Sequence, residues 1–135
     1  MKYFKIITTI LLVSSLCWTG CIKDIKMGND TPAAPTVKVL LPIEGDQFVN
    51  GQSITIKGDI ADVATLKSVT IKITDDKTGA VYYTSSLTSK DINNNAFNVA
   101  WAAKVPDWSD STITVTVENT NNQTAFKAVK IRIWL

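Results

Sequence analysis

ITVTV, residues 113–117, alternates β-branched apolar side chains with threonines at a strict period of two. Successive side chains of an extended strand point to opposite faces of its sheet. The isoleucine and the two valines are therefore predicted to lie on a core, and the two threonines on a solvated face. This pattern indicates a strand that is buried on one side only.

The same alternation recurs on both sides of this stretch. It predicts seven short strands, at residues 37–41, 54–60, 69–73, 80–86, 97–101, 113–117 and 129–133. No helical period is sustained between them, which excludes a parallel α/β architecture because parallel strands need crossover connections. Seven short strands on about 100 residues favour an all-β, two-sheet β-sandwich for residues 36–135.

Polar and glycine-containing segments separate the predicted strands. DDKTG at 75–79 predicts a hairpin turn in which Gly79 takes a positive φ. PIEGDQFVNGQ at 42–52 predicts a longer, turn-rich connection, and residues 105–110 and 119–123 are polar breaks. Each predicted strand is thus bounded by turn chemistry.

The last predicted strand contains one irregularity. Phe126 and Ala128 lie at even positions, whereas the apolar residues of 129–133 lie at odd positions. A slip of this kind predicts a β-bulge. Trp134 then falls on the face opposite the isoleucines, where it is expected to be exposed or to cover the bottom of the sandwich.

Two sequence patterns carry a resemblance to a known family. Pro42, Gly45, Phe48 and Gly51 form a P-x-x-G-x-x-F-x-x-G arrangement before the second strand. The hairpin ITVTVENTNNQT at 113–124 lies where many bacterial immunoglobulin-like domains have V-x-V-x-D-x-x-G-N. On these patterns residues 36–135 resemble such a domain, which implies an immunoglobulin-like sandwich of about seven strands.

The segment departs from that family at three points. It has no cysteine pair, and no tyrosine stands near the start of the strand at 111–118 to form a tyrosine corner. Asn121 or Asn122 replaces the glycine of the final hairpin, and asparagine also tolerates the left-handed region. The expected fold class survives all three departures.

The first twenty residues are organised like a secretory signal peptide. Lys2 and Lys5 form a basic head, and the apolar run that follows at 6–16 is about eleven residues long. A membrane-spanning helix needs about 20 apolar residues, so this run is too short to cross a bilayer. We expect residues 1–20 to be a signal peptide that is removed.

Thr19-Gly20-Cys21 resembles the end of a bacterial lipobox, in the looser form found in Bacteroidetes-type lipoproteins. Small residues suit cleavage between Gly20 and Cys21, although Trp18 stands where leucine is usual. The resemblance implies that Cys21 carries covalent lipid and that Cys17 leaves with the signal peptide. The alternative is an ordinary signal peptide that leaves Cys21 as a free thiol.

Residues 21–35 would then form a lipidated end and a flexible tether. A linker of this length spans roughly 20 Å root-mean-square, enough to hold a small domain clear of the headgroups. Two or three acyl chains make a stable anchor where one does not. We therefore expect a lipid-anchored protein of the cell envelope, at the outer membrane, on its periplasmic face or at the cell surface.

The charge balance argues against nucleic acid as a partner. The chain has 14 Lys plus Arg and 12 Asp plus Glu, a formal net charge of +2. Removal of the signal peptide takes Lys2 and Lys5 with it, so the mature chain would be formally neutral. No basic stripe remains that could neutralise phosphates.

The residues that most often carry out catalysis are scarce. The chain has no histidine, and acylation of Cys21 would leave no thiolate. Asp75 and Asp76 are the adjacent carboxylate pair available for glycosidase chemistry, but their turn context favours capping of the hairpin. We expect no enzymatic activity, with an unusual hydrolase based on this pair as a distant alternative.

Calcium is the metal worth weighing, because it binds several carboxylate oxygens. The acidic residues in or near predicted turns are Glu44, Asp46, Asp59, Asp62 and Glu118. They form no D-x-D-x-D run, and scattered surface acids are usually solvated charges. We therefore expect neither calcium nor any other cofactor besides the lipid.

Aromatic residues give the functional hypothesis. Trp108 lies in a polar loop, and the adjacent residues Tyr82 and Tyr83 cannot both face the core of a strand. These three are the candidate ligand-binding residues, since flat aromatic faces beside polar groups suit sugar rings. The alternative is that Trp108 folds back and plugs the end of the core. Residues 110–112, Asp-Ser-Thr, also resemble a short glycosylation signal of some Bacteroidetes.

The sequence thus favours a membrane-anchored surface lipoprotein with a non-catalytic immunoglobulin-like domain for binding, adhesion or display. Its expected partners are the membrane, through the lipid, and a glycan or a surface protein. One alternative is a carbohydrate-binding accessory module of a surface glycan-uptake system. Another is a protein-interaction or spacer domain that presents a strand edge or its threonine-rich face.

Overall fold

The computed structural model describes residues 33–61 and 66–135, and in this part of the chain it has eight β-strands and no helix. The strands are β1 (Thr36–Leu41), β2 (Gln47–Val49), β3 (Ser53–Ala61), β4 (Leu66–Asp75), β5 (Val81–Leu87), β6 (Ala96–Ala102), β7 (Ser109–Asn119) and β8 (Thr124–Trp134). No long apolar helix of the kind that crosses a membrane occurs in the described residues. The predicted signal peptide, Cys21, most of the tether and Asp62 lie outside them.

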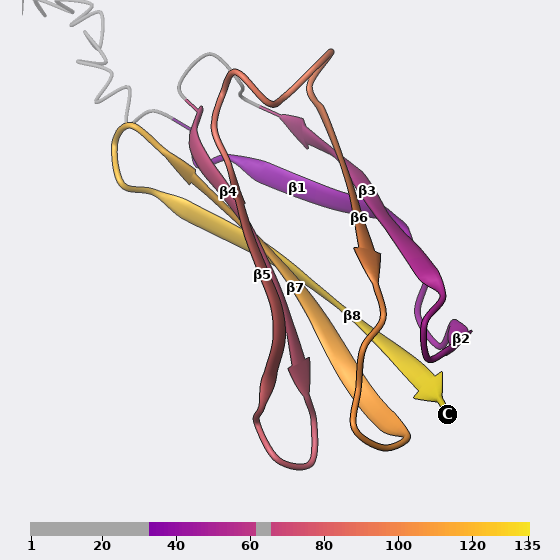
Figure 1. Ribbon diagram of the computed structural model, residues 1–135. Helices are drawn as coiled ribbons and strands as arrows, with labels where there is room; N and C mark the ends of the chain where they lie inside the picture. The colour runs from indigo at the N-terminus through magenta and orange to yellow at the C-terminus, as the bar shows by residue number, and fades with distance from the viewer. Residues whose placement is uncertain (1–32, 62–65) are drawn as a thin grey trace, which may run out of the picture.

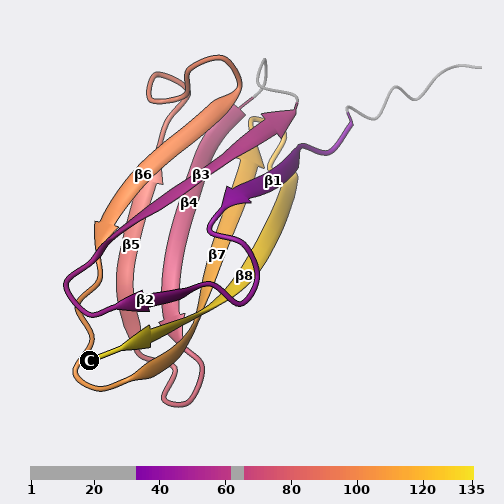
Figure 2. The same ribbon diagram turned by 90° about the vertical axis from the view of Figure 1, so that its right-hand side faces the viewer.

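The strands form two sheets that pack face to face (Figures 1 and 2). One sheet has three strands in the order β1-β3-β6, and the other has five in the order β2-β8-β7-β4-β5. All neighbouring strands pair antiparallel except β2, which pairs parallel with β8. The chain passes to the five-stranded sheet for β2 and back for β3, and then crosses from β3 to β4, from β5 to β6 and from β6 to β7. The last three crossings are those of immunoglobulin-like sandwiches. The predicted all-β sandwich is confirmed.

The core follows from the period-two pattern. Along β7 every odd-numbered residue is buried and every even-numbered one is half-exposed. Strand β7 pairs with β4 and β8 in a register that sets Ile113 between Ile73 and Val129, so apolar side chains line one face of three strands. Burial of each such side chain contributes about 2 kcal/mol. The facing sheet adds Ile54, Ile56, Ile60, Phe97 and Trp101.

An eighth strand, β2, lies inside the segment predicted as a turn-rich connection. It is three residues long, too short for an alternating pattern to register. Its pairing partner is the end of β8, with Gln47 opposite Arg132 and Phe48 opposite Ile133. A tertiary contact rather than local sequence therefore defines this strand.

The predicted bulge in the last strand is wrong. Pairing of β7 with β8 runs without interruption from Ser109 opposite Ile133 to Glu118 opposite Thr124. Phe126 is an outer-face residue, 72% exposed, directly opposite Thr116. The sequence therefore contains an apolar side chain on the solvated face, not a slip in register.

Two turn residues adopt the predicted left-handed backbone. Gly79 has φ of 74°, and Asn122 in the final hairpin has φ of 59°. Gly58 has a different role, because a Cβ there would overlap the carbonyl oxygen of Lys38 and lie 2.7 Å from Cζ of Phe97. Strands β1 and β3 and the ring of Phe97 can pack this closely only around a glycine.

The two ends of the described fold lie far apart. Strand β1 begins at one end of the sandwich, and the C-terminus lies at the other end in both views (Figures 1 and 2). Residues 33–35 therefore lead into β1 at the end of the sandwich opposite the last residues of β8.

Candidate ligand-binding site

Two tryptophans form an exposed pair near the C-terminus. Trp108, in the segment between β6 and β7, is 52% exposed, and Trp134, the last residue of β8, is 43% exposed. Their ring centroids are 6.5 Å apart and the ring planes make an angle of 25°, a stacked arrangement. Trp108 therefore lies on the surface and does not plug the core.

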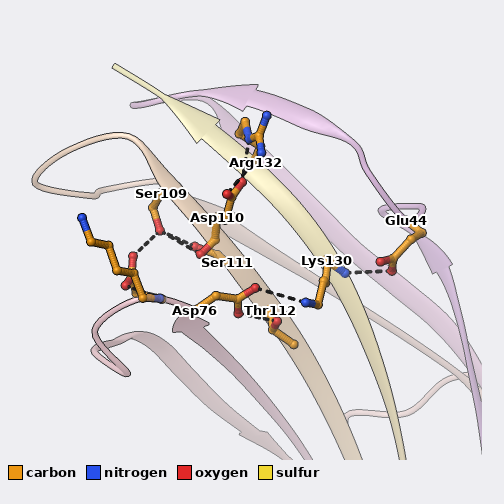
Figure 3. Close-up of polar contacts among 10 residues, drawn as sticks. Glu44, Asp76, Ser109, Asp110, Ser111, Thr112, Lys130 and Arg132 are labelled. Atoms are coloured by element: carbon orange, nitrogen blue, oxygen red, sulfur yellow. Dashed lines mark hydrogen bonds and ion pairs between the residues drawn. The ribbon is translucent and has the colours of Figure 1, made fainter.

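An arginine and an aspartate lie directly beside this pair. The guanidinium carbon of Arg132 is 5.5 Å from the ring centroid of Trp134, within range of a cation–π interaction. Arg132 also donates two hydrogen bonds to Asp110, from Nε to Oδ1 at 2.6 Å and from NH2 to Oδ2 at 3.1 Å. The two residues are opposite each other on β7 and β8, and Figure 3 shows their side chains meeting above the sheet.

This bidentate pair favours the ionised form of both side chains. The hydrogen bonds from Arg132 lower the pKa of the Asp110 carboxyl, and the same contact raises the pKa of the guanidinium. Both side chains are about half exposed, so the pair contributes little to stability but holds two planar polar groups in one orientation. A ligand would meet a preorganised donor and acceptor beside the aromatic rings.

Strand β2 and its flanking turn brace the site from the edge of the sheet. The indole Nε1 of Trp134 donates a hydrogen bond to Oε1 of Gln47 at 3.0 Å. The backbone N–H of Arg132 donates to the carbonyl of Asp46 at 2.9 Å. The strand that sequence reasoning missed thus orients one of the two tryptophans.

A depression of about 370 Å³ lies on the outer face of the sheet, next to the Arg132–Asp110 pair. Each positive side chain in this depression is paired with a negative one, because Nζ of Lys130 lies 3.7 Å from Oδ2 of Asp76 and Arg132 pairs with Asp110. Asp76 also accepts a hydrogen bond from the Thr112 hydroxyl at 2.6 Å (Figure 3). The lining residues are Gly45, Gln47, Asp76, Asp110, Lys130, Ile131 and Arg132.

A second depression, of about 300 Å³, lies on the other side of Asp110. It is bounded by the 75–80 turn and by the 106–110 segment that carries Trp108. Tyr82 contributes to its lining. Asp110 therefore lines both hollows, and Trp108 lines the second.

Asp75 anchors the turn beneath the second depression. Its Oδ1 accepts hydrogen bonds from the N–H groups of Lys77 and Thr78 and from the Thr78 hydroxyl, at 2.6 to 3.0 Å. Its Oδ2 accepts from Ser109 at 2.6 Å and from Tyr82 at 2.9 Å. These bonds, that from Ser109 above all, hold the pKa of Asp75 well below its usual range. A carboxylate with five donors is a hairpin cap and has no capacity left for general-base chemistry.

The two candidate tyrosines have different surroundings. Tyr83 packs against Trp101 of the core, with ring centroids 6.1 Å apart. Tyr82 lies at the register shift between β4 and β5, and burial raises the pKa of its phenol. Only Tyr82 therefore lies near Trp108, and its hydroxyl is committed to Asp75.

The calcium candidates are dispersed. Glu44 accepts the backbone N–H of Lys130, Asp46 caps the turn at Ile43, and Asp59 lies within β3. Glu118 pairs with Lys67 at 2.9 Å. Among residues 33–61 and 66–135, no three acidic, histidine or cysteine side chains are grouped as a metal site would require.

The resemblance to a glycosylation signal at 110–112 meets a steric obstacle. Ser111, the acceptor in that signal, is 0% exposed and its hydroxyl lies 2.8 Å from that of Ser109. In the folded domain this hydroxyl is closed to a glycosyltransferase.

Comparison with known proteins gives the fold and no closer relationship. No protein-family model matches the sequence, and no curated protein matches it. The fibronectin(III)-like modules of Clostridium thermocellum CbhA are similar over 73% of this chain and 96% of theirs, with 11% identity and a TM-score of 0.50. A superoxide reductase (neelaredoxin) from Ignicoccus hospitalis is similar over 75% of this chain and 80% of its own, with 4% identity and a TM-score of 0.51. The titin M3 domain is similar over 76% and 98%, with 13% identity and a TM-score of 0.47.

At such identities the first two similarities show the fold alone, a β-sandwich of the fibronectin(III)-like kind. That fold is consistent with a non-catalytic domain. The reductase provides no reason to expect redox chemistry, because fold alone does not carry a reaction.

Proposed function

We propose that this chain is a lipid-anchored protein of the bacterial cell envelope whose immunoglobulin-like domain binds a ligand without catalysis. The observation that carries the binding role is the exposed stacked pair of Trp108 and Trp134 beside the Arg132–Asp110 fork. Aromatic faces with a few fixed polar groups are what small-ligand sites usually offer. The anchor rests on the sequence around Cys21 and on the tether that follows it.

The ligand we propose is an uncharged glycan. The positive charges of the first depression are matched by Asp76 and Asp110, so an anionic ligand would have to displace a carboxylate. Sugar hydroxyls can instead accept from Arg132 and donate to Asp110 at the same time. In this role the protein would be a carbohydrate-binding accessory module of a surface glycan-uptake system.

The binding role is tested on soluble residues 31–135, which contain every described strand and the whole core. In Trp108→Ala the affinity for the uncharged members of a glycan array should fall at least ten-fold, because the stacked pair is removed. Phe126→Ala is the matched control, since Phe126 is an exposed aromatic on the same sheet but not part of the site. Binding should also change little between about 0.05 and 0.5 M NaCl, as expected for an uncharged ligand.

Equal loss of binding in Trp108→Ala and Phe126→Ala would argue against this site. No binding by well-folded protein to any glycan would contradict the carbohydrate role and favour a protein-interaction or spacer domain.

The anchor is tested separately in cells of a bacterial host. Cys21→Ser should move the protein from the membrane fraction to the soluble fraction and abolish labelling by a radioactive fatty acid. A full-length chain that is not labelled would show that Cys21 is not acylated.

A further inference from the structure

The sandwich has four edge strands, and three of them are protected against pairing with another chain. Strand β1 carries Lys38 and a register irregularity between Val39 and Leu41. Strand β2 is only three residues long. Strand β5 has a register shift at Ile73/Thr74 of its partner β4. Charges, short length and irregular register are the usual means by which proteins protect sheet edges.

The fourth edge strand, β6, has none of these protections. Its sequence AFNVAWA contains no charge and no proline. It pairs with β3 through seven consecutive residues in unbroken register, so its backbone is regular along its whole length. It ends the three-stranded sheet, and Figure 2 shows it along the outer side of that sheet.

Most of the outer backbone of β6 is unpaired in the described structure. Ala96 exchanges backbone hydrogen bonds with Asn93, so the outward N–H and C=O groups of the first residue of β6 are already paired. Within residues 33–61 and 66–135, no backbone hydrogen bond from outside β3 reaches Phe97–Ala102. Three alternate residues, Asn98, Ala100 and Ala102, thus present free N–H and C=O groups on the outer edge of this regular strand.

We propose that β6 is a self-association surface, on which it pairs antiparallel with β6 of a second copy of this chain. A two-fold axis through Val99 would set Asn98 opposite Ala100 of the second copy and Phe97 opposite Trp101. The outward side chains, Asn98, Ala100 and Ala102, are small and uncharged, so no like charges meet across the new pair. Such an interface uses the same patch on both copies, as a closed dimer requires.

The composition of β6 favours a second copy over a different partner. A strand without charge offers nothing to select a charged peptide, whereas its own antiparallel image matches it in length, in polarity and in side-chain size. One added strand pair is a small interface, so we expect weak association, with a dissociation constant between about 10 μM and 1 mM. This inference is independent of the tryptophan site and of the lipid anchor.

Sedimentation velocity of residues 31–135 up to about 1 mM tests the proposal. The wild-type protein should show a concentration-dependent monomer–dimer equilibrium. Asn98→Lys with Ala100→Lys places lysines opposite each other across the proposed pair, and should weaken the dimer at least ten-fold. Asn98→Glu with Ala100→Lys changes the same exposed positions but makes each opposed pair attractive, and should preserve or strengthen the dimer.

Thr84→Lys with Ser86→Lys is the matched control, because it adds the same charge at exposed positions of edge strand β5. It should leave the dimer unchanged. A wild-type protein that stays monomeric throughout would overturn the proposal, and so would a dimer that the two lysines in β6 do not weaken. A dimer weakened equally by the β5 lysines would show that net charge, not β6 pairing, controls association.

Discussion

Asp75 shows how much one side chain can determine in this domain. It is 6% exposed, closes the β4–β5 turn through one oxygen and ties that turn to Ser109 through the other. The folded state favours its ionised form, since all five contacts donate hydrogen to it. Its folded pKa is therefore below the unfolded value of about 3.9, and its contribution to stability is present above that pH and is lost as the pH falls through the folded pKa.

We predict that Asp75→Asn lowers the melting temperature at pH 7 by roughly 5 °C or more. The amide turns an acceptor into a donor among groups that already donate. The difference from wild type should narrow as the pH falls below about 4, because the unfolded wild-type chain then binds a proton at Asp75 that the folded state, with its lowered pKa, does not bind. Thermal melts by circular dichroism from pH 2 to 8 would measure this, with Glu118→Gln as a control in an exposed ion pair. A difference that is the same at every pH would mean that the charge of Asp75 is irrelevant.

At the same scale, sequence reasoning identified one half of the candidate site. A tryptophan in a polar loop pointed to Trp108, but whether it was exposed or plugged the core could not be decided without its neighbours. The even position of Trp134 gave its direction, yet nothing local indicated that it would stack on Trp108. The Arg132–Asp110 pair depends on the register of β7 against β8, which the separate strand patterns do not contain.

At the scale of elements, the alternating pattern was sufficient wherever one face of a strand is buried. Long strands such as β7 repeat the pattern several times, so their position and inner face follow from sequence alone. The pattern failed in two places for different physical reasons. Strand β2 is held by its contact with β8 and not by its own periodicity, and Phe126 is an apolar residue that the solvated face tolerates. The pairing order of the strands, which brings β2 to the site, also lies beyond local patterns.

For the edge strands, too, the sequence predicts one part of the feature and only the fold shows the other. A strand without charge or proline can be read from the sequence at 96–102, but its place at an edge is a property of the sandwich. Strand β4 lies between two neighbours, so its backbone is paired on both sides. The proposed association of β6 therefore depends on its place at an edge as well as on its uncharged sequence.

At the scale of the whole molecule, the position of the site relative to the tether has a functional consequence. The chain enters β1 at one end of the sandwich, and Trp134 ends β8 at the other (Figures 1 and 2). A domain held to a membrane through Cys21 would therefore present Trp108 and Trp134 away from the bilayer. The same domain held through its C-terminus would press that end against the surface.

We predict that the direction of attachment decides whether the site can be reached. Residues 31–135 attached to nickel-chelating vesicles by an N-terminal histidine tag should bind a large uncharged polysaccharide, and the same domain attached by a C-terminal tag should bind at least ten-fold less. Flotation of the vesicles with the labelled polysaccharide measures this, and both tagged proteins should bind equally when free in solution, which controls for damage by the tag. Equal binding in the two orientations on vesicles would place the ligand site away from the tryptophan end. Binding only through the C-terminal attachment would place it at the end of the sandwich where the tether enters.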